Sequence, residues 1–136
     1  MWGSTSWGFI NDNPEWAFLK DYAIPGFDAR EVKPDIWMQI TIPNEFQPLG
    51  KYNIGCTAGI ESTGCQGEWI SGLNRMNMNF VSSKHSRNVF QSLEFDVIDN
   101  NTKKPTGQKI KCEKPIHVIF EGADLDVYKY LPSSEI

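Results

Sequence analysis

Apolar and polar positions alternate in several short segments of this 136-residue chain. The clearest segment spans residues 36–42, where bulky or β-branched side chains on both sides predict a strand covered on both faces. The same pattern predicts strands at Tyr52–Thr57, at residues 76–83 and at residues 116–120. Two further runs flank a cluster of turn formers and predict a hairpin near residues 95–112.

Helical spacing of apolar residues appears between these predicted strands. Asn13 can cap a first helix that places Trp16 in the core, and a Pro-Gly pair ends it. Residues 67–76 and 84–93 each carry one apolar face, and Ser83 is placed to cap the second of them. Strands that alternate with helices indicate an α/β fold, with a mostly parallel, Rossmann-like sheet flanked by helices.

Length and charge narrow the classes of protein that fit. The chain has the length of one domain, and its 40% hydrophobic and 22% charged residues are typical of a soluble protein. A net charge of -4 leaves no basic face for phosphate groups, which argues against a nucleic-acid partner. No apolar run reaches the roughly 20 residues of a membrane span, and the first residues lack a signal-peptide pattern. We therefore expect a cytoplasmic protein without a membrane span.

Three widely spaced cysteines, Cys56, Cys65 and Cys112, form no CxxC pair. An odd number does not suit a disulfide framework, so we expect reduced thiols. A zinc site that combines them with His85 and His117 is the alternative, but their spacing gives it no support, and we expect no metal.

Polar or glycine-containing groups follow four of the predicted strands. The carboxyl ends of parallel strands meet at one edge of a sheet, and ligands of open α/β sheets bind there. We therefore expect these groups to form one cleft. The groups are Asn44–Glu45, Thr57–Glu61, Ser82–His85 and Glu121–Asp124.

Each candidate in these groups also has a purely structural interpretation. Ser83 can be a helix cap, and Gly59 can serve a turn with positive φ. Glu61 can stabilise the start of the following helix, while His85 can be a solvated surface residue. The Asn44–Glu45 pair can complete a turn. No catalytic triad and no phosphate-binding fingerprint is present in the sequence.

Three segments, "NIGCTAGIES", "EWISGLNRMNMNFVSSKHSRNVF" and "HVIFEGADLDVYKY", carry a resemblance. Together they are similar to the acceptor-side, N-terminal half of GT-B-fold glycosyltransferases of the retaining group 1 or RfaB-like type, in versions found in tailed phages and marine bacteria. Val81 begins a match to the "V-P-S" motif, which an S-x-x-V-F helix follows. Phe120–Asp124 matches the family's "P-N-G-V-D" region, ahead of Tyr128 and Pro132. The resemblance extends over about residues 35–132.

The resemblance implies a hexosyltransferase that takes a sugar from a nucleotide-sugar donor, its co-substrate, and needs no tightly bound cofactor. Its partner would be a sugar or glycan acceptor. Residues 35–122 would be the acceptor-side domain, and residues 1–34 a helical or irregular segment of it. Residues 123–136 would begin an interdomain linker to a donor half that the chain lacks. The linker region would include Glu121, Gly122 and Asp124.

The resemblance also assigns the site. Glu61 and His85 would be the catalytic candidates, and many family members carry a histidine where this chain has Ala58. One half supplies only acceptor positioning, so we expect little transfer from the isolated chain. A non-catalytic glycan-binding module or a decayed remnant of such an enzyme is the alternative. The acceptor-binding residues would be Asn44, Glu45, Thr57, Gly59, Glu61, Ser83 and Lys84.

Overall fold

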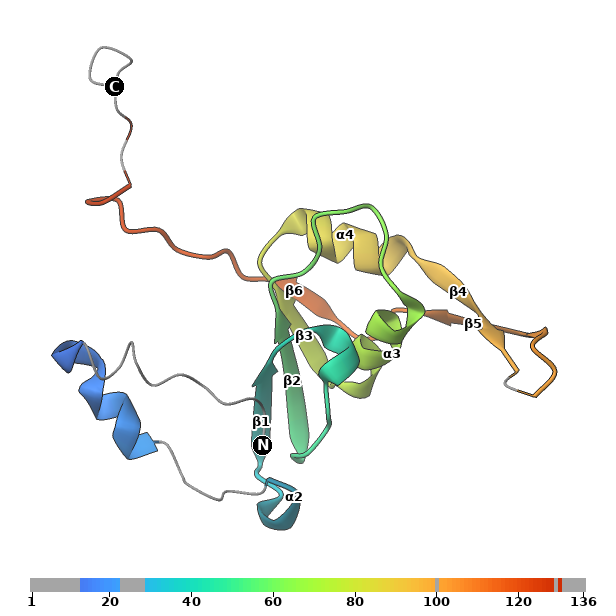
Figure 1. Cartoon of the computed structure of the whole chain (residues 1–136), viewed down its shortest axis with the longest axis horizontal. Coiled ribbons are helices and arrows are strands. Elements are labelled where there is room, and N and C mark those ends of the chain that lie inside the picture. Colours follow the sequence, from blue (N-terminus) through green and yellow to red (C-terminus); the bar gives the residue numbers. More distant parts are fainter. Residues whose placement is uncertain (1–12, 23–28, 100, 129, 131–136) are drawn as a thin grey trace.

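The computed structural model describes residues 13–22, 29–99, 101–128 and 130 of the chain. Figure 1 shows a sheet of four strands with helices packed against it and a two-stranded arm beside it. The elements, in chain order, are η1 (Pro14–Tyr22), α2 (Ala29–Val32), β1 (Ile36–Ile40), η2 (Pro43–Glu45), β2 (Tyr52–Thr57), α3 (Gly67–Arg75), β3 (Met78–Val81), α4 (Lys84–Ser92), β4 (Glu94–Ile98), β5 (Pro105–Lys111) and β6 (Ile116–Val118).

The main sheet is parallel throughout and has the strand order β1-β2-β3-β6. Each crossover therefore moves in the same direction across the sheet. Since such crossovers are right-handed, η2, α3 and α4 all lie on one face. The predicted α/β fold with a mostly parallel sheet flanked by helices is confirmed. The predicted hairpin is also confirmed, because β4 and β5 pair antiparallel.

The core lies between the sheet and α3 and α4. Phe46, just after η2, is buried against this layer, and Trp37 and Trp69 pack on its margin. The inward position predicted for these two tryptophans is therefore confirmed. The buried cluster comprises Phe46, Ile70, Leu73, Met76, Val81, Phe90 and Ile116.

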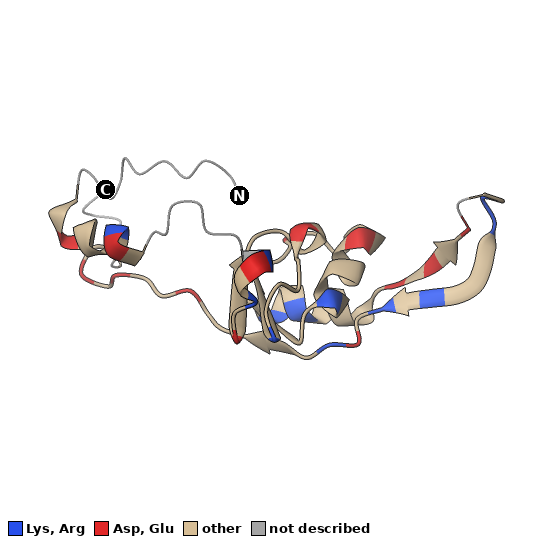
Figure 2. Ribbon diagram, turned by 90° about the horizontal axis from the view of Figure 1, so that it is seen from below, with Lys and Arg blue, Asp and Glu red and all other residues tan. Residues whose placement is uncertain are grey.

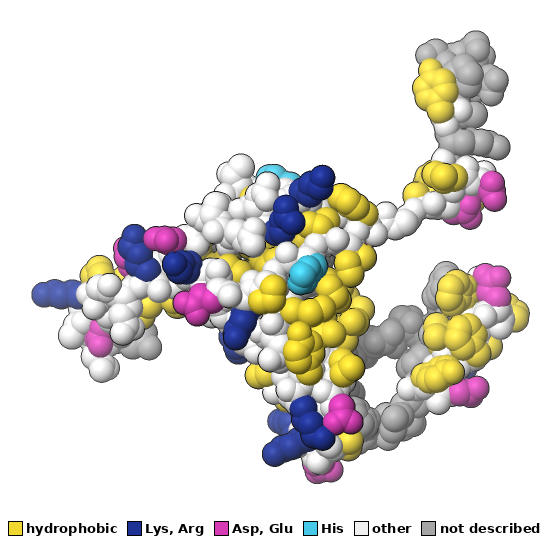
Figure 3. Space-filling view, turned by 180° about the vertical axis from the view of Figure 1, so that it is seen from behind, with side chains coloured by type: hydrophobic (Ala, Val, Ile, Leu, Met, Phe, Trp, Pro, Cys, Tyr) yellow, Lys and Arg dark blue, Asp and Glu magenta, His cyan; other side chains and the backbone are white. Residues whose placement is uncertain are grey.

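The opposite face of the sheet is apolar, and no described element covers it. Ile36, Met38 and Ile40 are 65%, 49% and 75% exposed, and Figure 3 shows hydrophobic side chains gathered over this face. The prediction that β1 is covered on both faces was wrong. The prediction failed because the strand order places every described crossover on the other side of the sheet.

The buried side of β1 carries a polar residue, Gln39. Its side chain donates to the carbonyl of Glu45 at 3.1 Å and accepts from the backbone N–H of Gln47 at 2.9 Å. These bonds satisfy the amide, so burying it costs little. In β1, Trp37 and Gln39 therefore face the core, while Ile36, Met38 and Ile40 point away from it.

The first helical segment also differs from expectation. It is a 3-10 helix with no buried residue, and Trp16 is 42% exposed, so the prediction that this tryptophan lies in the core was wrong. Its ring lies against Phe18, with ring centroids 6.4 Å apart, rather than against the sheet. Figure 1 shows η1 standing away from the sheet. Pro25 and Gly26, which we expected to end this helix, lie outside the described residues.

Beyond β6 the chain leaves the sheet. This strand ends at Val118, two residues before the predicted end, and the following segment extends away from the domain (Figure 1). A turn at Asp124 follows, in which the backbone N–H groups of Val127 and Tyr128 donate to its carbonyl. Within the described ranges, no helix is long and apolar enough to cross a membrane.

Candidate functional site

A cleft of about 340 Å³ opens at the carboxyl edge of the parallel sheet. The ends of β2 and β3, the first turn of α4 and the residues after β6 form its walls. Three of the four polar groups predicted to meet at this edge do so. The lining residues are Ala58, Gly59, Ile60, Glu61, Ser82, Ser83, His85, Ser86 and Glu121.

Two serines of α4 fix the inner wall of the cleft. Ser83 is the N-cap of α4, as predicted, and its hydroxyl accepts from the backbone N–H of Ser86 at 3.0 Å. Ser86 is 2% exposed, and its hydroxyl lies 2.9 Å from that of Ser83. It also accepts from the N–H of Ile60 at 3.1 Å and donates to the Ile60 carbonyl at 3.2 Å. The loop after β2 is therefore tied to the start of α4.

The close contact at Gly59 depends on the absence of a side chain. Its φ of +95° confirms the predicted turn with positive φ. A Cβ at this position would lie 2.2 Å from the hydroxyl oxygen of Ser86. Thr57 is buried in β2 and does not line the cleft; its hydroxyl oxygen accepts from the N–H of Gly59 at 3.4 Å. Thr57 therefore stabilises the turn at Gly59 through a hydrogen bond and does not contact the cleft.

The ionisable groups of the cleft are two carboxylates and one imidazole. Glu61 and Glu121 are exposed, so both can meet a ligand. His85 is exposed as well, and its Nε2 lies 3.2 Å from the carbonyl oxygen of Ser62. Ser82 donates its hydroxyl hydrogen to the carbonyl of Ala58 at 2.7 Å.

Among the residues that the structure describes, no Lys or Arg lines this cleft. Lys84 is exposed on the first turn of α4 but is not part of the lining. Figure 2 shows lysines on the β4–β5 arm instead, where Lys109 and Lys111 are exposed. The cleft is therefore acidic and rich in hydroxyl groups.

The structure does not bring Asn44 and Glu45 into the cleft. Both belong to η2, where Arg75 donates to the Asn44 carbonyl at 2.8 Å and Thr41 donates its hydroxyl hydrogen to the Glu45 carboxylate. The packing of η2 against α3 draws this turn toward the helix layer, so the purely structural interpretation of the pair holds. Of the group after β6, only Glu121 lines the cleft, and Gly122 and Asp124 lie beyond it.

Sequence reasoning missed Ser86 as a part of the site. The bond between Ser86 and Ile60 spans 26 positions, and no local pattern reveals it. The spacing of Ser83 and Ser86 is that of residues N-cap and N3 of a helix, which could have suggested that their side chains meet.

The three cysteines are free thiols. Burial raises the pKa of Cys56, and the negative charge of Glu121 raises it further. Burial is also the main cause of the raised pKa of Cys65 and of Cys112. A thiol with a raised pKa is a weaker nucleophile and metal ligand near neutral pH. Among the residues the structure describes, no three His, Cys, Asp or Glu side chains come together to hold a metal ion.

Comparison with known proteins adds no family to this picture. No family model, no curated protein and no solved structure matches the chain.

Proposed function

We propose that this chain is the acceptor-side half of a retaining, nucleotide-sugar-dependent glycosyltransferase, and that the cleft binds the sugar acceptor. The observation that carries the proposal is the composition of the described lining, which has hydroxyls, two carboxylates and an imidazole but no Lys or Arg. Such groups exchange hydrogen bonds with the hydroxyls of a neutral sugar. A diphosphate would instead call for basic side chains, and it would meet two like charges here.

The sequence resemblance supports the same assignment. The segments similar to GT-B glycosyltransferases include both "NIGCTAGIES" and "VSSKHS", which supply most of the cleft lining. The position of the cleft at the carboxyl edge is also the usual ligand site of open α/β sheets.

In this proposal Glu61 accepts a hydrogen bond from the reacting hydroxyl of the acceptor. Its carboxylate is exposed, so it can orient that hydroxyl or receive its proton. His85 is the second candidate at the mouth of the cleft, because a neutral imidazole can donate or accept. Ser82 and Glu121 hold other acceptor hydroxyls, which fixes the orientation of the sugar.

The donor would be a nucleotide sugar that a separate donor half binds. The described residues of the cleft offer no cation for the departing diphosphate, and that charge needs electrostatic support in the transition state. We therefore expect the chain alone to bind an acceptor without transferring sugar. A glycan-binding module without catalysis would use the same cleft, and an added donor half would then restore no transfer.

Ligand-observed NMR with methyl pyranosides and with uridine diphosphate tests the acceptor assignment. We expect the wild-type chain to bind at least one neutral pyranoside and to bind the diphosphate more weakly. Glu61→Gln should weaken pyranoside binding about tenfold, because a hydrogen bond to a charged acceptor is lost. Glu113→Gln is the matched control, since Glu113 is exposed outside the cleft. Stronger binding of the diphosphate, or no binding of any pyranoside, would overturn the proposal.

A further inference from the structure

A second cavity, of about 390 Å³, adjoins the acceptor cleft. Ile60 belongs to the lining of both, so the two cavities are neighbours. Ile60, Cys65 and Trp69 give the second cavity an apolar surface. Gly64 and Gln66 complete the lining, and none of the five residues carries a charged side chain.

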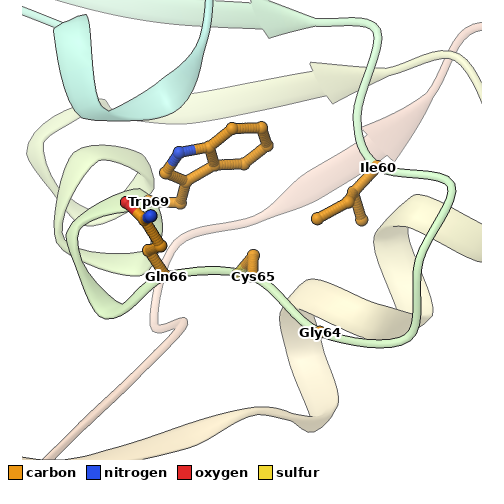
Figure 4. A pocket seen from close by; sticks show the side chains of 5 residues that line it. All are labelled: Ile60, Gly64, Cys65, Gln66 and Trp69. Atoms are coloured by element: carbon orange, nitrogen blue, oxygen red, sulfur yellow. The ribbon is translucent and has the colours of Figure 1, made fainter.

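The walls of this apolar cavity are held by contacts to the folded core. The indole of Trp69 lies against the ring of Phe90, which is fully buried, with ring centroids 6.2 Å apart. The backbone of Ile60 is fixed at both its N–H and its carbonyl by the buried hydroxyl of Ser86. Figure 4 shows the side chains of Ile60, Cys65 and Trp69 directed toward one space inside the loop that leads to α3. The fold therefore holds Trp69 and the backbone of Ile60 in place at this open pocket.

We propose that the apolar cavity binds an aryl or short alkyl group carried by the same acceptor whose hydroxyls occupy the cleft. This inference rests on the proposed function and specifies its substrate class as a neutral, amphiphilic glycoside. The pocket is open to solvent on one side, and its volume of about 390 Å³ leaves room for one aromatic ring against the apolar wall. The indole face of Trp69 offers a stacking surface for it.

The charges around the two cavities favour a neutral ligand. Glu61 and Glu121 line the cleft, and Glu68 is exposed in the first turn of α3, next in sequence to Trp69. An acceptor with a phosphate or carboxylate between its sugar and its apolar group would meet the two carboxylates of the cleft. An uncharged glycosidic link avoids this repulsion.

Paired ligands that differ only in the apolar group test the inference. Methyl and phenyl glycosides of the same pyranose are titrated into the wild-type chain and followed by NMR. We expect the phenyl glycoside to bind about tenfold more tightly, as the burial of one ring predicts. We also expect nuclear Overhauser effects between the phenyl protons and the indole protons of Trp69.

Gly64→Trp adds a bulky side chain at a residue that lines the apolar cavity. No atom lies within 4 Å of a Cβ built at Gly64, so a side chain can begin at this position without a clash. We expect this variant to lose the preference for the phenyl glycoside and to keep its affinity for the methyl glycoside. Gln108→Trp, at an exposed position on the β4–β5 arm, is the control and should change neither affinity.

The outcomes separate this inference from the proposed function. Equal affinities for the two glycosides, or a phenyl ring without contacts to Trp69, would overturn the inference and leave the acceptor assignment standing. If neither glycoside binds, the proposed function fails and the inference fails with it. Tighter phenyl binding that Gly64→Trp removes supports both.

Discussion

At the scale of single residues, the inner wall of the cleft depends on the contact between Gly59 and Ser86. We expect Gly59→Ala to lower the free energy of unfolding by about 1–3 kcal/mol. The new Cβ would lie 2.2 Å from the Ser86 hydroxyl oxygen, and a φ of +95° strains any L-residue with a side chain. Urea denaturation measures this loss.

Gly64→Ala is the matched control for that prediction. This glycine lies in the same loop, has no positive φ and has no neighbour within 4 Å of a built Cβ. We expect it to leave the chain as stable as the wild type or slightly more stable, because alanine restricts the unfolded chain. Equal losses in the two variants would show that the contact with Ser86 does not determine the stability of the loop.

The conformations of the cleft residues could be predicted only where neighbouring residues in the sequence determine them. The N-cap at Ser83 and the positive φ at Gly59 follow from the few residues around them, and both were predicted correctly. The position of Asn44 and Glu45 was not predictable in this way. Arg75, about 30 positions away, binds the carbonyls of their turn and draws it to the helix layer.

A carboxylate also organises the turn between β4 and β5. Hydrogen bonds lower the pKa of Asp99 below its usual value near 3.8, first from the backbone N–H of Thr102, then from its hydroxyl and from the N–H of Asn101. Because the folded pKa is lowered, the carboxylate supports the turn above the unfolded value, and this support is lost as pH falls through the folded pKa.

We expect Thr102→Val to raise the pKa of Asp99 toward its usual value, because it removes the hydroxyl donor that lies 2.9 Å from Oδ1. An NMR titration of the Asp99 carboxyl group measures the midpoint. Thr106→Val is the control, since Thr106 lies in β5 outside the turn. An unchanged midpoint in Thr102→Val would assign the lowered pKa to the backbone donors alone.

At the scale of elements, α3 and η2 pack closely enough that their contact needs a glycine. Gly72 is buried in α3, and a Cβ built on it would lie 1.8 Å from the carbonyl oxygen of Pro43. We expect Gly72→Ala to cost about 3 kcal/mol or more, because backbone cannot yield as the tip of a side chain can. Thermal unfolding followed by circular dichroism measures the change.

Ser71→Ala tests whether the effect belongs to the contact with η2 or to α3 itself. Ser71 neighbours Gly72 but bonds only within the helix, to the carbonyl of Gly67 at 3.2 Å. We expect its replacement to change stability by less than about 0.5 kcal/mol, since alanine is the better helix former. A large loss in this control would place the sensitivity in the helix and not in its packing.

Alternation along the chain predicted the strands well but not which side of each strand is buried. The position of a strand follows from the local alternation of apolar and polar residues. The strands β1, β2 and β3 lie close to their predicted ranges. The covered face depends on strand order, which brings together residues distant in sequence. In β1 the apolar set Ile36, Met38 and Ile40 was therefore predicted to be covered, although no described element packs on it.

At the scale of the whole molecule, this apolar sheet face is the largest departure from the usual α/β arrangement. Parallel sheets are normally covered on both faces, and here η2, α3 and α4 share one face. Exposed apolar patches of this kind favour association in water. We therefore expect the association of the chain in solution to depend on side chains that contribute little to its core.

The double variant Ile36→Lys/Ile40→Lys tests this dependence. The two isoleucines are 65% and 75% exposed, so we expect a loss of only about 1 kcal/mol in unfolding free energy. Sedimentation velocity should show less association than in the wild type, and binding of a hydrophobic dye should fall. Ile70→Ala, at a position with no exposure, sets the scale for a buried site and should cost about 2–5 kcal/mol. If the lysine variant loses as much as Ile70→Ala, the sheet face is covered in solution, and its exposed isoleucines are core residues of a larger packed structure.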